Sequence, residues 1–214
     1  MKLHNWIDLT HLISPETIVY PGDPALIIVN KNDYPKSDFH IDEITSAMHV
    51  GTHLDSPFHF IKDGNSIDDI DINQVVGDAS VVKVTVVDNV IATASIEKQY
   101  NSLEHKHPIL LISTNHSELF NKNEYFLECP SFEKSIFDFV IKYRITCIGL
   151  DLPTIQYASE SPKNAHLDFL GNNIIIIEGL NLLETLSSEV FFIGLPLKIK
   201  GIDGSLIRAI AKNI

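Results

Sequence analysis

Cysteine, basic charge and long apolar runs are all scarce in this sequence, and each shortage excludes a class of protein. The two cysteines, Cys129 and Cys147, form no CxxC pair, so we expect buried free thiols rather than a disulfide framework or a cysteine metal site. There are 16 basic and 28 acidic residues, which gives a net charge of -12 and a pI near 5.1. This balance disfavours nucleic acid and anionic membrane surfaces as partners.

Targeting and membrane signals are missing as well. No run approaches the roughly 18 apolar residues that a membrane-spanning helix requires, and the amino terminus reaches Asp8 too early for the apolar stretch of a signal peptide. We therefore expect no membrane partner and a cytoplasmic location. No repeat or linker divides the 214 residues, so we interpret residues 1–214 as a single domain with its own core.

Runs rich in valine and isoleucine predict the strands. Several of these runs are too continuously apolar for a sheet with one wet face, so we expect strands that are covered on both sides. The runs span residues 79–87, 109–113, 145–150, 174–177 and 190–199.

One helix is predicted downstream of Pro130, where apolar residues recur at helical spacing and Ser131 is a suitable N-cap. The stripe consists of Phe132, Ile136, Phe139, Val140 and Tyr143. We expect this helix to pack on the sheet.

A second helix is predicted over residues 163–170. Ser161 suits its N-cap, Pro162 its first turn and Gly171 its end, and His166 lies within it. Helices interleaved with buried strands indicate an α/β fold. Because the first third of the chain has no helical pattern, we expect a mixed sheet rather than a doubly wound parallel one.

The segment 49–59 carries most of the functional signal. If it is extended, alternate side chains share one face, and that face holds His49, Gly51, His53, Asp55, Pro57 and His59. Three imidazoles and a carboxylate make a poor core face but suit a divalent cation. Pro57 should end or bend the strand, which would separate His59 from the metal ligands and leave it available for proton transfer. An HxxxH pair can arise by chance among 10 histidines, but the matching phase of Asp55 and His59 favours a metal or catalytic role.

The other histidines have weaker patterns. The polar surroundings of three of them favour solvated loops, and these are His105, His107 and His116. Three more lack a neighbouring ligand set and are interpreted as structural or as supports for other residues; these are His4, His11 and His40.

Two residues of the later part of the chain stay open on their pattern alone. Glu178 follows four isoleucines at the end of a buried strand, where an unpaired carboxylate would be costly and a cation would relieve the cost. His166 is a lone histidine on a predicted helix, which is compatible with either a structural or a functional role.

Residues 49–60, HVGTHLDSPFHF, resemble the HxGTHxDxPxHF signature of the cyclase-like metal hydrolases, a family that includes bacterial kynurenine formamidases. The resemblance extends over nearly the whole chain. It is supported by the segments 7–11 and 20–24, by His166 and Glu178, and by the segment 201–205.

The resemblance implies a site with two divalent metal ions. His49, His53 and Asp55 would bind one ion, His166 the other, and Asp55 and Glu178 would bridge both. His59 would be the proton acceptor and donor. Tyr20 would contribute to the substrate pocket, at a position that tryptophan holds in the family's formamidases. The family also implies a swivelling β/β/α fold and a homo-oligomer, dimer or tetramer.

These ligands are nitrogen and oxygen atoms, a set that suits zinc first and also manganese. The implied reaction is hydrolysis of N-formylkynurenine to kynurenine and formate, a step of tryptophan degradation, by a metal-bound hydroxide with His59 moving the proton. One alternative is hydrolysis of another cyclic or aryl amide or of a lactone, as with isatin. Another is a metal-binding protein without turnover.

Overall fold

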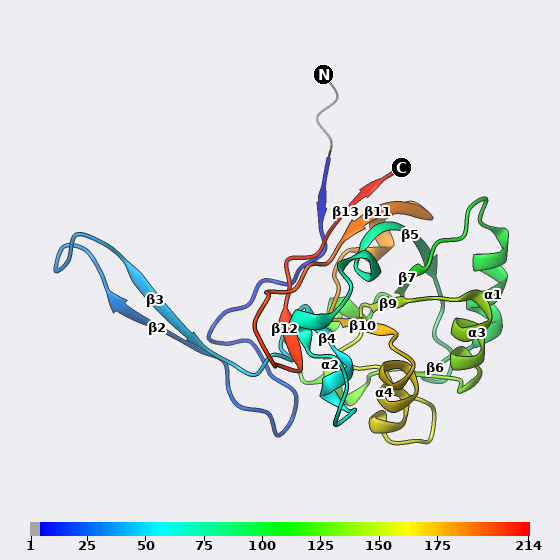
Figure 1. Ribbon diagram of the computed structural model, residues 1–214, viewed down its shortest axis with the longest axis horizontal. Coiled ribbons are helices and arrows are strands. Elements are labelled where there is room, and N and C mark those ends of the chain that lie inside the picture. Colours follow the sequence, from blue (N-terminus) through cyan, green and yellow to red (C-terminus); the bar gives the residue numbers. More distant parts are fainter. Residues whose placement is uncertain (1–4) are drawn as a thin grey trace.

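The computed structural model describes residues 5–214, and a nine-stranded mixed sheet runs through that part of the chain (Figure 1). In spatial order the strands are β1 (Ile7–Asp8), β13 (Ile210–Asn213), β11 (Glu189–Ile193), β5 (Val76–Lys83), β7 (Ile109–Ser113), β9 (Cys147–Leu150), β10 (Ile175–Glu178), β4 (His53–Asp55) and β12 (Gly204–Leu206). Strands β5, β7, β9 and β10 are parallel, whereas the strands on both sides of them are antiparallel. The prediction of a mixed α/β sheet is confirmed.

The central strands are buried on both faces, as their continuous apolar runs predict. Every residue of β7, β9 and β10 is buried. Alternate side chains enter two separate core clusters, so that Leu110 and Ile148 belong to one and Leu111 and Ile175 to the other. Several strand boundaries differ from expectation: β5 spans Val76–Lys83 rather than residues 79–87, β9 begins at Cys147 rather than residue 145, and β11 ends at Ile193, well before residue 199.

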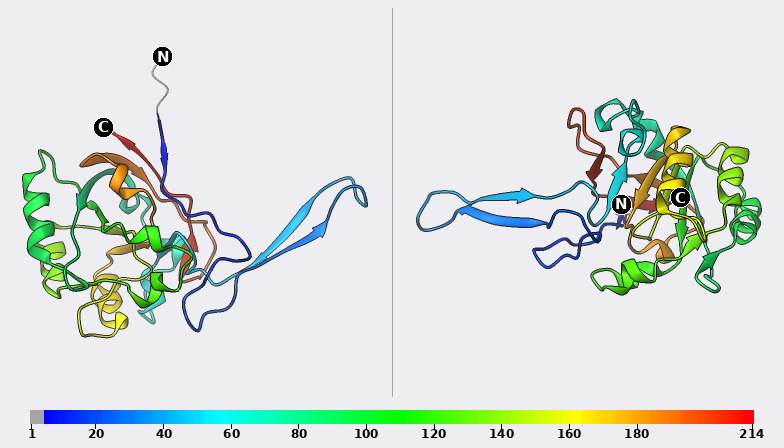
Figure 2. Two further views of the ribbon diagram at one scale, coloured as in Figure 1. Left: turned by 180° about the vertical axis from the view of Figure 1, so that it is seen from behind. Right: turned by 90° about the horizontal axis from the view of Figure 1, so that it is seen from below.

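Three helices cover one face of the sheet (Figures 1 and 2). They are α1 (Thr93–Ser102), α3 (Ser135–Tyr143) and α4 (Pro162–Gly171). Helix α4 confirms the predicted segment, and Ser161 is its N-cap residue although its side chain makes no capping hydrogen bond. A shorter helix, α2 (Glu124–Leu127), and five 3-10 turns complete the helical elements of the described chain; the turns are Pro57–His59, Ile67–Asp69, Ile72–Gln74, His116–Leu119 and Leu183–Thr185.

The predicted start of α3 is wrong. Ser131 and Phe132 form strand β8, which pairs with β6 (Val90–Ile91), and the helix begins at Ser135 with Lys134 as its N-cap residue. The backbone of Phe132 is extended because its N–H donates to the carbonyl of Gln156. Its side chain is fully buried in the same core cluster as the helix, which explains why it matched the apolar stripe.

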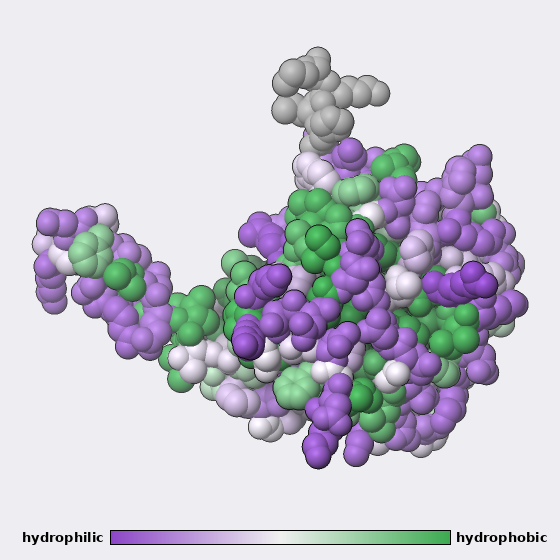
Figure 3. Space-filling view, in the orientation of Figure 1, coloured by the Kyte–Doolittle hydropathy of each residue, from purple (hydrophilic) through white to green (hydrophobic). Residues whose placement is uncertain are grey.

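A two-stranded arm projects from the body of the molecule (Figures 1 and 2). It consists of β2 (Ile27–Asn32) and β3 (Ile41–Thr45), which pair antiparallel with each other. Every residue of β3 is exposed, including the apolar Ile41 and Ile44. Apolar side chains are visible where the arm meets the body (Figure 3).

The membrane expectation can be examined for the same part of the chain. Within residues 5–214 no helix has the length and apolar character needed to cross a bilayer.

Candidate metal centre

The signature segment turns sharply at both ends, so the expectation of an extended chain over 49–59 holds only for His53–Asp55. Before the strand, Gly51 has a φ of +60°, and a Cβ there would lie 2.8 Å from the Ile13 side chain. After the strand, Pro57 opens a 3-10 turn that carries His59, which confirms that the strand ends at the proline. The two turns bring His49 and His59 back over the strand.

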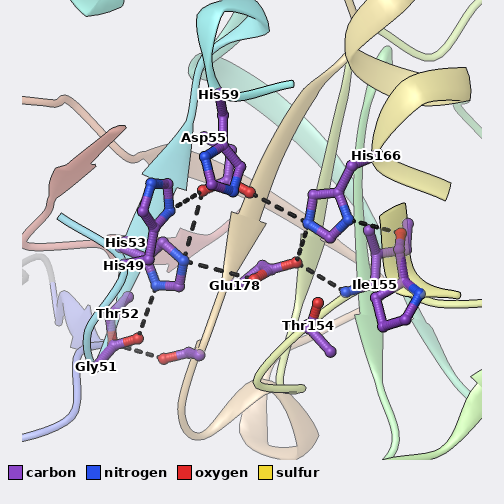
Figure 4. A network of polar contacts seen from close by, with 12 residues as sticks. His49, Gly51, Thr52, His53, Asp55, His59, Thr154, Ile155, His166 and Glu178 are labelled. Atoms are coloured by element: carbon purple, nitrogen blue, oxygen red, sulfur yellow. Dashed lines mark hydrogen bonds and ion pairs between the residues drawn. The ribbon is translucent and has the colours of Figure 1, made fainter. Parts of the chain in front are cut away.

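Strand pairing positions the buried carboxylates. Strand β10 runs antiparallel to β4 with Glu178 opposite His53 and Ile176 opposite Asp55. Directly paired residues of antiparallel strands share a face, and so do residues two apart on one strand. Glu178, His53 and Asp55 therefore project to the same side, and helix α4 adds His166 (Figure 4).

Both carboxylates lie between His53 and His166, and Asp55 also contacts His49 (Figure 4). Asp55 places Oδ1 2.7 Å from His49 Nδ1 and 3.5 Å from His53 Nε2, and its Oδ2 lies 3.5 Å from His166 Nε2. Glu178 places Oε2 3.4 Å from His53 Nε2 and Oε1 3.5 Å from His166 Nε2. The N–H of Ile155 donates to Glu178 Oε1 at 2.7 Å and orients that side chain.

The outer ring nitrogens of these histidines have acceptors of their own. His53 Nδ1 lies 3.1 Å from the carbonyl of Gly51, and His166 Nδ1 lies 2.9 Å from the carbonyl of Pro162. Donation to these carbonyls fixes the tautomer in which Nε2 carries a free lone pair facing the carboxylates. A ligating histidine held by its second nitrogen is the usual arrangement of a metal site in proteins.

Electrostatics point to positive charge between the carboxylates. Burial opposes ionisation of Asp55, but His49, His166 and His53 outweigh it and hold the pKa of Asp55 well below its usual value. Burial also opposes the charged form of His166, yet Asp55 and Glu178 raise its pKa to about 10. The Oδ2 atom of Asp55 is buried without a hydrogen-bond partner. Without a metal, protonated imidazole supplies this positive charge. A divalent cation can replace the proton on a ligating nitrogen, so two buried anions with an orphaned oxygen and imidazoles around them fit divalent cations.

His59 lies beside this cluster rather than within it. Its ring stacks on His49 with centroids 3.9 Å apart, and its Nδ1 lies 3.3 Å from Asp203 Oδ2. The same Asp203 oxygen lies 3.0 Å from His49 Nε2. Asp203 was not among the predicted site residues, although it stands in the segment 201–205 that matches the family pattern.

A cavity of about 560 Å³ opens over the cluster. Its walls include all seven predicted site residues, namely Tyr20, His49, His53, Asp55, His59, His166 and Glu178. Aromatic side chains complete it, and Tyr20 meets Phe126 edge to face at 5.7 Å. The structure thus brings the predicted residues together, while their roles as ligands, base and substrate contact stay predictions.

Comparison with known proteins agrees with this arrangement. The Cyclase family model matches residues 7–157. The chain belongs to the Cyclase family. Kynurenine formamidase of Bacillus cytotoxicus is 30% identical and that of Bacillus mycoides 29%, each over 100% of both chains. Isatin hydrolase A from Labrenzia aggregata, solved with benzyl benzoate, superposes with a TM-score of 0.85 at 23% identity, over 98% of this chain and 93% of that chain.

At 23% identity the likeness to this isatin hydrolase shows the fold alone, and together with the mixed sheet it confirms the predicted α/β architecture. The family membership confirms the resemblance drawn from the signature segment.

The other histidines among residues 5–214 of this Cyclase family member lie outside the cluster. His105 and His107 pair with Glu189, and His105 is exposed as expected. The solvated-loop interpretation is wrong for His116, which is buried, stacks on Tyr125 and lies with Nε2 2.8 Å from the carbonyl of Tyr125.

Three further histidines were interpreted as structural. His11 is buried and stacks on Phe120, a cavity residue, with centroids 3.8 Å apart. His40 pairs with Asp33 and Asp42 on the arm side, away from the cavity lining. His4 lies outside the described residues. The two cysteines are buried free thiols, as predicted.

Proposed function

We propose that this chain is a metal-dependent amidohydrolase that converts N-formylkynurenine to kynurenine and formate. The observation that carries the proposal is the pair of buried carboxylates, Asp55 and Glu178, which both lie between His53 and His166 and line a cavity. The full-length similarity to kynurenine formamidases suggests the substrate. In this proposal the reaction belongs to tryptophan catabolism in the cytoplasm, and residues 1–214 act as one domain.

Two divalent cations, zinc first and manganese second, would be held by the cluster. His49 and His53 would serve one ion and His166 the other, and the carboxylates Asp55 and Glu178, which lie between these imidazoles, would serve both. Such ions act as Lewis acids, because they acidify water and stabilise negative charge on a carbonyl oxygen. The donor set has no thiolate, which favours these metals over softer ones.

The chain's own residues bind the substrate and move the proton. His59 lines the cavity, and Asp203 holds its Nδ1, so Nε2 is the nitrogen available to the substrate. Hydrolysis adds one water across the formyl carbon–nitrogen bond, and His59 Nε2 would accept a proton from that water as its oxygen bonds to the formyl carbon. His59 would then return the proton to the aryl amine nitrogen as the carbon–nitrogen bond breaks, which leaves formate and kynurenine. Tyr20 and Phe126 form an aromatic wall suited to the aryl ring, although tyrosine offers less area than tryptophan.

A substrate panel tests the proposal. We expect N-formylkynurenine to have the highest kcat/KM of a set that includes isatin, other aryl formamides and a lactone. Isatin is included because solved isatin hydrolases share the fold. Faster hydrolysis of isatin or of the lactone would transfer the assignment to that substrate, and no turnover of any member in protein holding two metals would favour a metal-binding role without catalysis.

We further propose that the protein is a homodimer. The arm formed by β2 and β3 exposes apolar side chains that would be buried against a second copy; they include Ile27, Val29, Phe39, Ile41 and Ile44. Both ends of the arm lead into the cavity lining, which contains Asp23 before it and Ser46 after it. Contacts between the arm and a second copy would therefore affect the position of the cavity residues that flank the arm.

A further inference from the structure

The three histidines of the cluster differ in what holds their outer nitrogen. His53 and His166 donate to backbone carbonyls, whereas His49 Nε2 faces the side chain of Asp203 at 3.0 Å. The same Asp203 Oδ2 atom accepts a hydrogen bond from His59 Nδ1 at 3.3 Å. One carboxylate oxygen thus joins a proposed metal ligand to the proposed proton carrier.

We propose that Asp203 is a positioning residue that fixes both imidazoles at once. It holds His49 with Nδ1 toward Asp55, and it holds His59 in the tautomer whose Nε2 is free to serve the substrate. This inference rests on the proposed function, because it assigns Asp203 a part in the same site. Its effect on His49 concerns metal affinity and can be measured without any substrate.

Backbone hydrogen bonds and sheet pairing hold Asp203 next to the end of β4 and close to His49. Its carbonyl accepts hydrogen bonds from the N–H and the hydroxyl of Ser56 at 3.0 and 2.9 Å, which ties it to the end of β4. The next residue, Gly204, pairs with Asp55 in the sheet. A Cβ at Gly204 would lie only 2.7 Å from His49 Cε1, so glycine is required for the ring to approach the strand.

Because the Asp203 side chain is partly exposed, its removal should affect the imidazoles that it contacts more than the stability of the fold. Its side chain is 41% exposed and lines the cavity, whereas Asp55 is 1% exposed. Ion pairs at this exposure contribute little to folding stability. A carboxylate that accepts from a ligating or proton-carrying imidazole instead affects metal affinity and ring orientation, where its loss costs about 10 to 100-fold.

The stacking of His59 on His49 explains why one acceptor serves both rings. Their centroids lie 3.9 Å apart with an interplanar angle of 25°. A carboxylate at their common edge fixes both ring planes and provides negative charge for whichever imidazole carries an extra proton. An amide can accept from one ring, but it lacks that charge and adds donors that would face the second ring.

The test compares Asp203→Asn with wild type and with Asp63→Asn, an exposed acidic residue that serves as a control for the lost charge. In the zinc-loaded protein we expect Asp203→Asn to lower kcat for N-formylkynurenine by about 10 to 100-fold with KM nearly unchanged. In the His59→Ala background the same substitution should lower kcat much less, because part of its effect acts through His59.

Two readouts besides turnover complete the experiment. Chelator competition should show zinc bound about 10-fold or more weakly by Asp203→Asn than by the control. Nitrogen NMR of the imidazoles should show His59 with its proton on Nδ1 in wild type and a mixture of tautomers in the variant. If wild type does not hydrolyse the formamide, these two results still decide the role of Asp203. Unchanged zinc affinity together with an unchanged His59 tautomer would overturn it.

Discussion

Glu178→Gln is the substitution whose effects the structure defines most closely. Glutamine has the shape of glutamate, and its Oε1 can keep the 2.7 Å hydrogen bond from the Ile155 N–H. The amide NH₂ then replaces Oε2, which lies 3.4 Å from His53 Nε2. The fold should persist, while one of the two carboxylates proposed to serve both metal ions is lost.

The expected loss concerns metal binding much more than the metal-free fold. Removing a direct anionic ligand should weaken the ions about 100-fold, or about 2.7 kcal/mol. At a metal concentration about 100 times the wild-type Kd, the stabilisation by metal would fall from about 2.7 to about 0.4 kcal/mol. In a chain of this size that difference corresponds to a loss of about 5 to 9 °C in Tm.

The metal-free proteins provide the reference for this comparison. Burial and the nearby Asp55 both oppose ionisation of Glu178, whereas His166 and His53 favour it and lower its pKa overall. Because this net lowering means that the charged carboxylate stabilises the metal-free fold, Glu178→Gln should unfold at a lower temperature than wild type in chelator. The loss of metal binding is therefore measured as the smaller rise in Tm on adding zinc, with each protein compared with itself in chelator.

The assay is thermal unfolding with zinc and with chelator, together with metal content by mass spectrometry. Glu184→Gln, an exposed glutamate of the 3-10 turn Leu183–Thr185, is the matched control and should match wild type in both conditions. Two metals per chain and a wild-type response to chelator in Glu178→Gln would refute the assignment of Glu178 as a shared ligand.

Three other predictions follow from the site, the core and the arm. His59→Ala should keep its bound metal and lose about 100-fold in kcat, and an unchanged rate would remove His59 from the mechanism. Burial raises the pKa of Asp151 to about 6; because its folded-state pKa is above the unfolded value, wild type should lose stability as pH rises from about 4 to about 6. Asp151→Asn lacks this titration, so its unfolding free energy minus that of wild type, both from urea titrations, should rise by about 3 kcal/mol between pH about 4 and about 6. A difference that does not change with pH would contradict this prediction. If the arm forms the proposed dimer interface, Ile44→Asp, at a residue 59% exposed on the arm, should lower the mass measured by light scattering from that of a dimer to that of a monomer. A dimer mass that the substitution leaves unchanged would exclude the arm from the interface.

The parts of the fold that could be predicted from the sequence are those where a pattern and a burial requirement coincide. Residues 109–113 and 174–177 are continuously apolar because both faces of β7 and β10 are covered. Helix α4 has its proline and glycine at the expected ends. Helix α1 was not predicted, because its segment TASIEKQYNS has few apolar residues and buries mainly Ile96 and Tyr100.

The arm was not predicted for a related reason. Its strands bury no face within the chain, so they lack the alternation that marks a half-buried sheet. Several of their apolar residues stay exposed in the described part of the molecule. A sequence pattern alone does not show which exposed residues a second copy of the chain would bury.

The candidate site could be predicted where its residues are close in sequence. His49, His53, Asp55 and His59 form one motif, although turns at Gly51 and Pro57, rather than strand alternation, bring them together. Asp203 comes from a distant segment without neighbouring histidines, and only the pairing of β12 with β4 places it there. His116 seemed polar in sequence but is buried by its stack on Tyr125.

Hydrolysis of N-formylkynurenine by the purified protein, followed by absorbance, tests the central claim most directly. The rate is measured before chelation, after chelation and after zinc or manganese is restored. We expect rapid turnover that chelation abolishes and either metal restores. Turnover that is unaffected by complete metal removal would contradict the metal-dependent site, and absent turnover in protein shown to hold two metals would contradict the formamidase assignment.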